Sequence, residues 1–129
     1  MTKEKFNIEY TLKSVSPSVL WSYIGTAHGL ANWFADDVKY IGKRFTFFWN
    51  KMPQEAEQVG CRTGVFIRFR WNEDEQDYRK TFFEFRIHQI ELTGNTVLEV
   101  TDYAFPDEKE DSVELWNLQI DNLKRRLGI

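Results

Sequence analysis

Hydrophobic and polar residues alternate in the first segment of the chain, where Phe6, Ile8, Tyr10 and Leu12 are separated by polar side chains. This period of two predicts a β-strand that turns one face toward a core and the other toward water. The same alternation returns in six later segments, at residues 38–40, 45–49, 54–62, 65–71, 83–87 and 96–103. Because short turns separate most of these segments, the strands are predicted to be antiparallel.

Turn residues bound these strands. Residues 42–43 predict one tight turn, and Gly94 with Asn95 is typical of a two-residue hairpin. Residues 60–64, with a glycine at each end, indicate a bend or bulge, because a missing Cβ lets a sheet curl. The acidic segment 72–77 is expected to be a solvated loop.

Two short helices are predicted between the first strand and the second. Ser16 is placed to cap the first helix, Pro17 suits its first position, and Gly25 ends it. Thr26 is placed to cap the second helix, in which Gly29 lowers the helix propensity. These helices therefore interrupt the run of strands.

The last segment predicts a long amphipathic helix. Its charges suit the helix dipole, with acidic residues near its start and basic residues at 124–126, and Gly128 is placed to end it. At about 1.5 Å per residue the helix is about 30 Å long, enough to cross a sheet of six or seven strands. Five apolar residues form one stripe along it, flanked by Leu115 and Leu118. The stripe consists of Val113, Trp116, Ile120, Leu123 and Leu127.

These elements predict an α+β fold in which one curved antiparallel sheet of six to seven strands packs against one long C-terminal helix. The inward-facing residues of the sheet and helix are the candidate ligand-binding set. They either fill the space between sheet and helix or line a hydrophobic cavity there. The set consists of Phe45, Phe47, Trp49, Ile67, Phe69, Trp71, Phe83, Phe85, Trp116, Ile120 and Leu123.

Composition narrows the classes of function. With 129 residues, the chain is expected to form a single domain over 1–129. A net charge of −3 gives no cationic surface for nucleic acid, and no apolar run is long enough for membrane insertion. Cys61 is the only cysteine, so no internal disulfide forms, and without a secretion signal the expected location is cytoplasmic.

Few residues offer catalytic or metal-binding chemistry. His28 and His88 have no metal-ligand spacing, so neither a metal nor a cofactor is expected. Strand parity turns Asp102 inward, which allows either a buried proton-transfer group or, as favoured here, a rim carboxylate that bonds local backbone. A group of charged residues falls on the outer face of the sheet and predicts cross-strand ion pairs. These residues are Arg68, Arg70, Glu84, Arg86 and Glu99.

The order of elements over residues 4–128 resembles the START-like, or SRPBCC, superfamily, whose helix-grip fold wraps a curved sheet around a long C-terminal helix. The segment 29–36 (GLANWFAD) resembles the branch of homologues of a heat-shock chaperone ATPase activator. Four further segments look like a START-like family of Bacteroidetes proteins without assigned function. These segments are residues 82–87, 91–94, 100–104 and 114–116.

The resemblance implies three alternative functions. The first is binding of a small hydrophobic or lipid-like ligand between the sheet and the C-terminal helix, without catalysis. The second is a co-chaperone-like interaction with a chaperone partner whose ATPase it stimulates. The third is a cyclase-like or hydrolase-like enzyme, which the fold permits by analogy alone. The sequence leaves the oligomeric state open.

Overall fold

A computed structural model describes residues 2–74 and 81–129. In these residues, seven strands form one sheet with the order β1-β7-β6-β5-β4-β3-β2, and every neighbouring pair is antiparallel. The strands are β1 (Glu4–Leu12), β2 (Asp37–Ile41), β3 (Arg44–Trp49), β4 (Met52–Arg62), β5 (Phe66–Trp71), β6 (Phe83–Gln89) and β7 (Thr96–Ala104).

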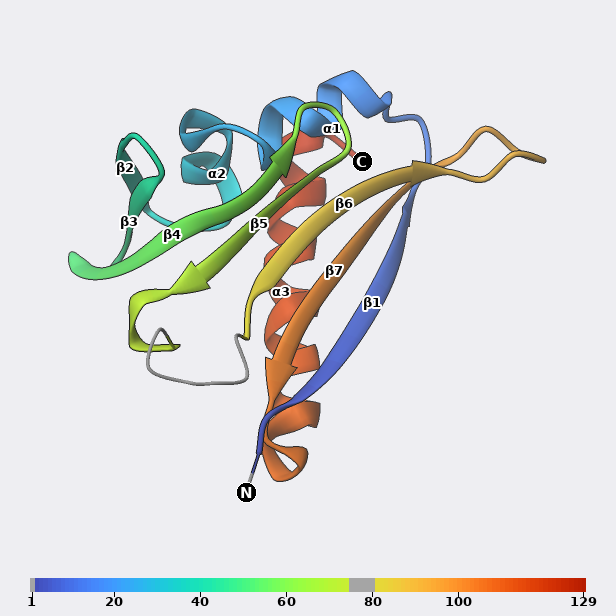
Figure 1. Cartoon of the computed structure of the whole chain (residues 1–129). Helices are drawn as coiled ribbons and strands as arrows, with labels where there is room; N and C mark the ends of the chain where they lie inside the picture. The colour runs from blue at the N-terminus through green and yellow to red at the C-terminus, as the bar shows by residue number, and fades with distance from the viewer. Residues whose placement is uncertain (1, 75–80) are drawn as a thin grey trace.

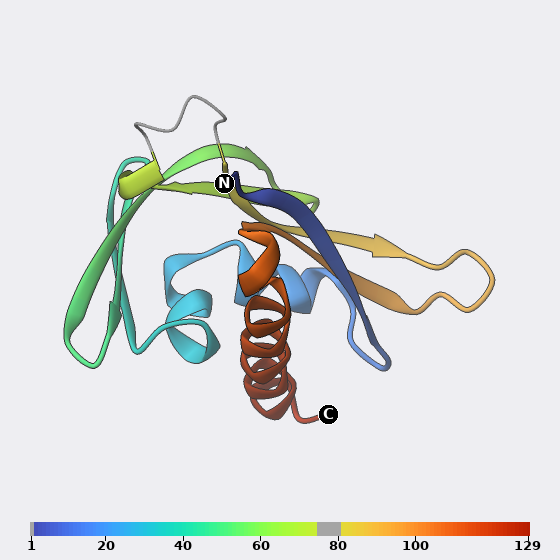
Figure 2. The ribbon, with the colours of Figure 1, turned by 90° about the horizontal axis from the view of Figure 1, so that it is seen from below.

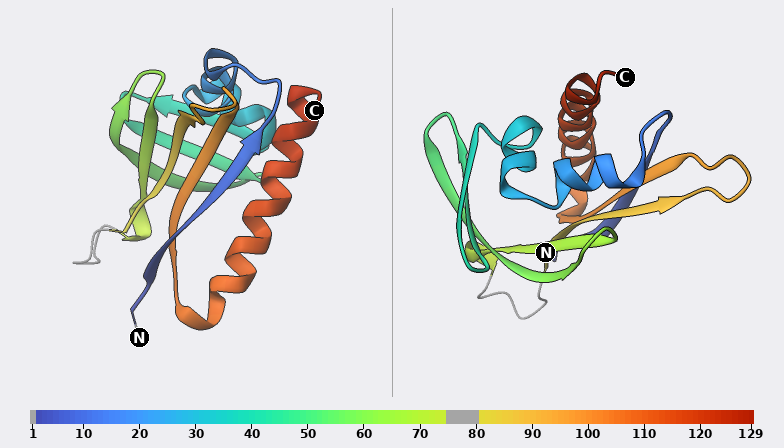
Figure 3. Two further views of the ribbon diagram at one scale, coloured as in Figure 1. Left: turned by 90° about the vertical axis from the view of Figure 1, so that its right-hand side faces the viewer. Right: turned by 90° about the horizontal axis from the view of Figure 1, so that it is seen from above.

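The three α-helices all lie on the concave side of the curved sheet (Figure 2). Helix α3 runs across the sheet, while α1 and α2 lie beside its C-terminal half (Figures 1 and 3). The predicted helix-grip α+β fold is therefore confirmed. The helices are α1 (Pro17–Ile24), α2 (Ala27–Trp33) and α3 (Lys109–Leu127), with short 3-10 helices at η1 (Asn72–Asp74) and η2 (Pro106–Glu108).

The predicted helix ends are confirmed. The Ser16 hydroxyl accepts a hydrogen bond from the backbone N–H of Val19, and the Thr26 hydroxyl accepts one from that of Gly29. Gly128 adopts a left-handed backbone with φ of 79° and ends α3. Side-chain caps satisfy N–H groups that would otherwise have no partner, so α1 and α2 each begin directly after their capping residue.

The turns follow the prediction in part. Residues 42–43 join β2 to β3 as expected, and β4 has its bulge between Gln58 and Gly60. The prediction of a two-residue hairpin at Gly94 and Asn95 is wrong, because the pairing of β6 with β7 already ends at Gln89 and Thr96. In the predicted segment 72–77, residues 72–74 form η1, and residues 75–77 lie outside the described part of the chain.

A six-residue loop takes the place of the tight hairpin. The Gly94 N–H donates back to the carbonyl of Ile90, and the Ile90 N–H donates to the carbonyl of Asn95. A tight type I′ turn requires a positive φ at both central residues, whereas Gly94 has φ of 71° and Asn95 does not have a positive φ. The loop extends away from the rest of the sheet (Figure 3).

Gly29 has a packing role that its low helix propensity conceals. A Cβ at this position would overlap the backbone carbonyl oxygen of Ser22 and lie 2.6 Å from Cα of Tyr23. Helix α2 therefore packs directly against the backbone of α1 at this point. The sequence predicted a weakness in the second helix, and the structure instead shows a contact that only glycine permits.

Gly29→Ala tests this contact. In an unhindered helix the substitution stabilises by about 0.5–1 kcal/mol, but here we expect it to lower the free energy of unfolding by about 2 kcal/mol, because backbone atoms must move apart. Urea unfolding measures the change. Gly60→Ala is the control, since its Cβ would meet side-chain atoms and no backbone, the Phe66 ring at 3.2 Å and Arg68 Cβ at 3.6 Å. A Gly29→Ala protein as stable as the wild type would contradict the expectation.

Tyr10 joins the edge strand β1 to α3, and its titration predicts a loss of stability at high pH. Its hydroxyl donates to Asn117 Oδ1 at 2.7 Å. Burial and, to a smaller extent, the carboxylate of Asp121 raise the pKa of Tyr10 from 10.0 to about 12. Because the folded state favours the neutral phenol, this stabilisation is fully present below pH 10 and is lost as the pH rises through 12.

We therefore expect the wild type to lose more stability than Tyr10→Phe when the pH is raised from 10 to 12. Urea unfolding at the two pH values gives the difference. Tyr40→Phe, at an exposed position on β2, is the matched control and should behave as the wild type does. Equal losses in the wild type and Tyr10→Phe would show that Tyr10 does not carry this pH dependence.

Candidate functional site

The space between the sheet and α3 is filled by aromatic rings. Phe34, the residue that ends α2, enters it from the side, and its ring centroid lies 5.3 Å from that of Phe47, 5.7 Å from that of Phe85 and 5.8 Å from that of Trp116. Phe34 itself is only 4% exposed. Close packing, rather than an empty wedge, is therefore the state of the central interior.

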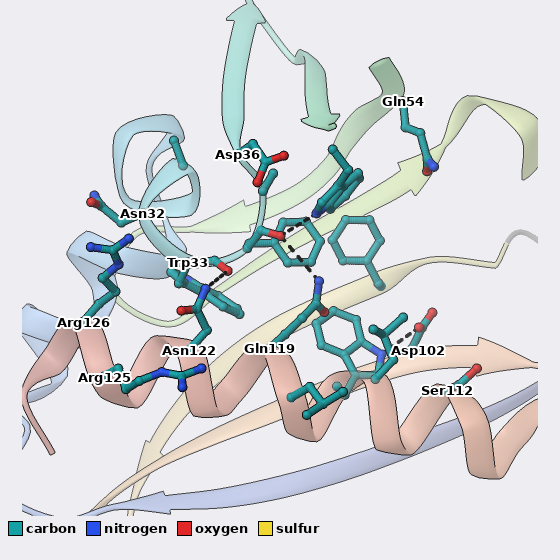
Figure 4. A pocket seen from close by; sticks show the side chains of 18 of the residues that line it. Asn32, Trp33, Asp36, Gln54, Asp102, Ser112, Gln119, Asn122, Arg125 and Arg126 are labelled. Atoms are coloured by element: carbon teal, nitrogen blue, oxygen red, sulfur yellow. Dashed lines mark hydrogen bonds between the residues drawn. The ribbon is translucent and has the colours of Figure 1, made fainter. Parts of the chain in front are cut away.

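A pocket of about 840 Å³ lies beside this packed centre, between α2, α3 and the concave face of the sheet (Figure 4). Four of the eleven sequence-predicted site residues line it, namely Trp49, Trp71, Phe83 and Trp116. The other seven lie in the packed core and do not line it. These seven are Phe45, Phe47, Ile67, Phe69, Phe85, Ile120 and Leu123.

Hydrogen bonds hold the indole groups of Trp49 and Trp116 in the pocket, and ring stacking holds that of Trp71. The Nε1–H of Trp49 donates to the carbonyl oxygen of Phe34 at 2.9 Å, and that of Trp116 donates to Asp102 Oδ2 at 2.9 Å. Trp71 stacks on Phe83 with a centroid distance of 4.9 Å. An indole whose N–H has a partner inside the protein presents a fixed apolar surface to a ligand.

Helix α3 also satisfies the carbonyl groups at the end of α2. The Asn122 side-chain amide donates to the carbonyl of Trp33 at 2.9 Å, and that of Gln119 donates to the carbonyl of Phe34 at 3.4 Å. The last carbonyls of a helix have no partner within the helix, so these bonds hold α2 against α3. The two helical walls of the pocket are therefore fixed to each other.

Asp102 lies at one end of the pocket, next to Trp116 (Figure 4). It faces α3, as strand parity predicted, and it is half-buried. Its Oδ1 accepts a hydrogen bond from the Tyr103 backbone N–H at 2.7 Å. The favoured interpretation, a carboxylate that bonds local backbone, is therefore confirmed, and the bond to Trp116 adds a second fixed contact.

The outer wall of the pocket is a part of α3 that the sequence analysis did not assign to the site. Ser112, Leu115, Gln119, Asn122 and Arg126 follow one another at steps of three, four, three and four residues, and all of them line the pocket. Each comes one position before a member of the buried stripe. This second stripe is therefore the sequence signal that could have found the wall.

Two leucines on this wall remain open to solvent. Leu115 is 58% exposed and Leu118 is 61% exposed, although both line the pocket. The rest of the rim is polar and contains charges of both signs. The polar and charged residues of the rim are Asn32, Asp36, Gln54, Asp102, Ser112, Gln119, Asn122, Arg125 and Arg126.

Among the described residues, the convex face of the sheet has a cross-strand ion pair of the predicted kind between Arg68 and Glu84, whereas Arg86 pairs with Glu84 within the same strand, β6. The guanidinium of Arg68 contacts Glu84 at 2.8 Å and that of Arg86 contacts it at 3.2 Å, and Glu84 is only 4% exposed. The Arg68 guanidinium also lies over the Phe82 ring, 4.2 Å from its centroid. These arginines are thus engaged within the protein.

His28 and His88 are both exposed. In residues 2–74 and 81–129, no group of three His, Cys, Asp or Glu side chains is placed to hold a metal ion. None of the helices in the described part of the chain combines the length and apolar character needed to cross a bilayer.

Comparison with known proteins gives the family. The model of the START-like superfamily domain matches residues 1–129. The chain belongs to this family. No curated protein matches the sequence. A protein from Bacteroides fragilis, solved by NMR in solution, is 43% identical to this START-like domain with a TM-score of 0.70, and the match covers 100% of this chain and 94% of that one.

More distant solved structures share the fold. The Aha1 dimer from Colwellia psychrerythraea has a TM-score of 0.75 at 16% identity, over 94% of this chain and 93% of that one. DynU16, from the dynemicin biosynthetic locus, has a TM-score of 0.75 at 14% identity, over 96% of this chain and 47% of that one. At these identities the START-like domain shares their architecture, and their activities do not carry over.

Asp102→Ala tests the hydrogen bond that holds Trp116. We expect it to lower the free energy of unfolding by about 1–3 kcal/mol, because the buried indole N–H loses its acceptor. Asp102→Asn retains an acceptor oxygen and should cost less. Urea unfolding gives the free energy of unfolding of both variants. The same two substitutions are then made in a Trp116→Phe background, which has no indole N–H to satisfy. An equal cost of Asp102→Ala in both backgrounds would contradict this account.

Proposed function

We propose that this START-like domain binds a small, largely apolar organic ligand in the pocket between α2, α3 and the sheet, without converting it chemically. The observation that carries the proposal is the pocket itself, at about 840 Å³, with aromatic side chains on its inner side. Binding sites for small molecules are about 300–1,000 Å³ and are lined mainly by apolar groups, with a few polar groups that orient the ligand.

The fixed walls support a binding role. The carbonyl groups of Trp33 and Phe34 are bonded to α3, and Trp49 is bonded to the end of α2. A pocket whose walls are already held in place loses little conformational entropy when it binds a ligand. The exposed leucines supply the driving force, since a ligand over Leu115 and Leu118 removes apolar surface from water.

The proposal moves the ligand relative to the sequence prediction. The ligand still lies between the sheet and α3, but Phe34 fills the centre of that space. The room for a ligand is therefore on the side that faces α2. Trp49, Trp71 and Trp116 are the members of the predicted set best placed to contact the ligand. With Trp33, four tryptophans line the pocket, so tryptophan fluorescence is a direct probe of binding.

Leu118→Asp tests the site. We expect it to weaken binding of apolar ligands about tenfold or more, because it places a charge on an apolar wall. Tryptophan emission during titration with a library of lipids, sterols and aromatic compounds gives the affinities, and native mass spectrometry gives the stoichiometry. Leu92→Asp is the matched control, since Leu92 is 98% exposed in the β6–β7 loop and does not line the pocket.

The enzyme alternative has one specific observation in its favour, the carboxylate of Asp102 beside the pocket. Its hydrogen bonds to Tyr103 and Trp116 favour a positioning role for this carboxylate. If the protein turns over any compound of the library, retention of that turnover in Asp102→Asn removes a proton-transfer role for Asp102. The co-chaperone alternative depends on the resemblance of segment 29–36 and on a likeness of fold. Its test is the ATP turnover of the organism's heat-shock chaperone with and without this protein.

A further inference from the structure

We propose that the ligand is an organic anion, whose carboxylate or phosphate group binds Arg125 and Arg126 while its apolar part lies along Leu115, Leu118 and the tryptophans. This inference rests on the proposed function and adds the chemical class of the ligand. It depends on how the charges and hydrogen bonds of the rim are distributed along the pocket.

The pocket has two chemically different ends (Figure 4). Arg125 and Arg126 lie at one end, near Asn32 and Asn122, whereas Asp102 lies toward the other end with Ser112. Residues 112 and 126 of α3 are separated by about 21 Å at 1.5 Å per residue. An elongated ligand can therefore contact both the arginines and the apolar wall.

The arginine end has cationic groups without an anion. Within residues 2–74 and 81–129, no carboxylate lies within salt-bridge distance of the Arg125 or Arg126 guanidinium, in contrast to Arg68 and Arg86 on the convex face. A guanidinium presents five N–H donors and binds carboxylate or phosphate through two parallel hydrogen bonds. The two arginines therefore offer donors that the fold does not use.

Most of the other polar groups of the pocket are already engaged in hydrogen bonds. The Asn122 amide donates to the carbonyl of Trp33 and the Asn32 amide to that of His28. Asp36 Oδ2 accepts from the Asn50 backbone N–H at 2.7 Å, and Asp102 accepts from the Tyr103 backbone N–H and from the Trp116 indole N–H. The two carboxylates of the pocket thus already accept hydrogen bonds from the protein, whereas the two guanidinium groups have no anionic partner within the described part of the chain. This difference favours a ligand with an anionic group over a ligand with a cationic group.

Charge at the end of α3 has a simpler role as well, since cations near a helix C-terminus complement its dipole. Lys124 separates the two roles. It lies in the same turn and complements the same dipole, but it does not line the pocket. Lys124→Gln is therefore a control matched to each arginine substitution in the charge that it removes and in its position in the last turn of α3.

The experiment uses four probes that share a ten-carbon chain and differ in their head groups: decanoate, decyl phosphate, decanol and decyltrimethylammonium. Each is titrated into the full chain below its micelle concentration, with tryptophan emission and calorimetry as readouts. We expect one or both anions to bind about tenfold more tightly than decanol, and the cation to bind more weakly than decanol. The anion with the larger gain identifies the preferred head group.

In Arg125→Gln/Arg126→Gln, we expect the preference for the anions over decanol to fall to within about threefold, with the affinity for decanol retained. Lys124→Gln should keep the preference, and circular dichroism confirms that each variant is folded. Higher ionic strength should reduce the preference in the wild type, because exposed charges are screened.

The outcomes separate this inference from the proposed function. Binding of all four probes with equal affinity, or tightest binding of the cation, overturns the anion inference and leaves the pocket as an apolar binding site. An anion preference that survives in the double variant, or that Lys124→Gln removes equally, overturns the assignment to Arg125 and Arg126. Failure of every probe to bind counts against the pocket as a site for this class of ligand and overturns both.

Discussion

The rest of the structure depends on the packing of Phe34 into the space between the sheet and α3. Its ring contacts aromatic residues of β3, β6 and α3 at once, at centroid distances between 5.3 and 5.8 Å. A curved sheet and a straight helix diverge toward one side, and a residue from a third element must fill the gap to reach native density. Because Phe34 ends α2, its position also fixes where α2 lies and therefore where the pocket lies.

The pocket follows from this arrangement. Helix α2 ends at the sheet, and its last carbonyls are satisfied by Asn122, Gln119 and Trp49 from two other elements. Buried carbonyl groups without partners are costly, so these bonds determine the distance between α2 and α3. The two helices remain apart beyond that point, and the aromatic edge of the core together with the outer stripe of α3 is left open to a ligand.

Aromatic residues therefore have two roles in this START-like domain. Phe47, Phe69 and Phe85 are fully buried in the aromatic core, whereas Trp49 and Trp71 are half-buried and line the pocket. The tryptophans differ from the phenylalanines because an indole combines a large apolar surface with an N–H that needs a partner. Such a group is suited to the border between a dry core and a site that exchanges water for ligand.

The sequence by itself determined the strand pattern, the capped helices and the buried stripe of α3, because periodicity and capping depend on residues close together in the chain. It also placed Asp102 on the inner face by parity.

The sequence did not determine which of the aromatic residues fill the core and which face the pocket, because that depends on where Phe34 meets strands that follow it in the chain. The tight hairpin at Gly94 was wrong for a related reason, since strand pairing ended before the turn residues. Only the tertiary structure decided that Gly29 is required by the backbone of α1 and that the outer stripe of α3 shares one pocket with α2 and the sheet. These properties come from the distance between elements, and no local pattern encodes that distance.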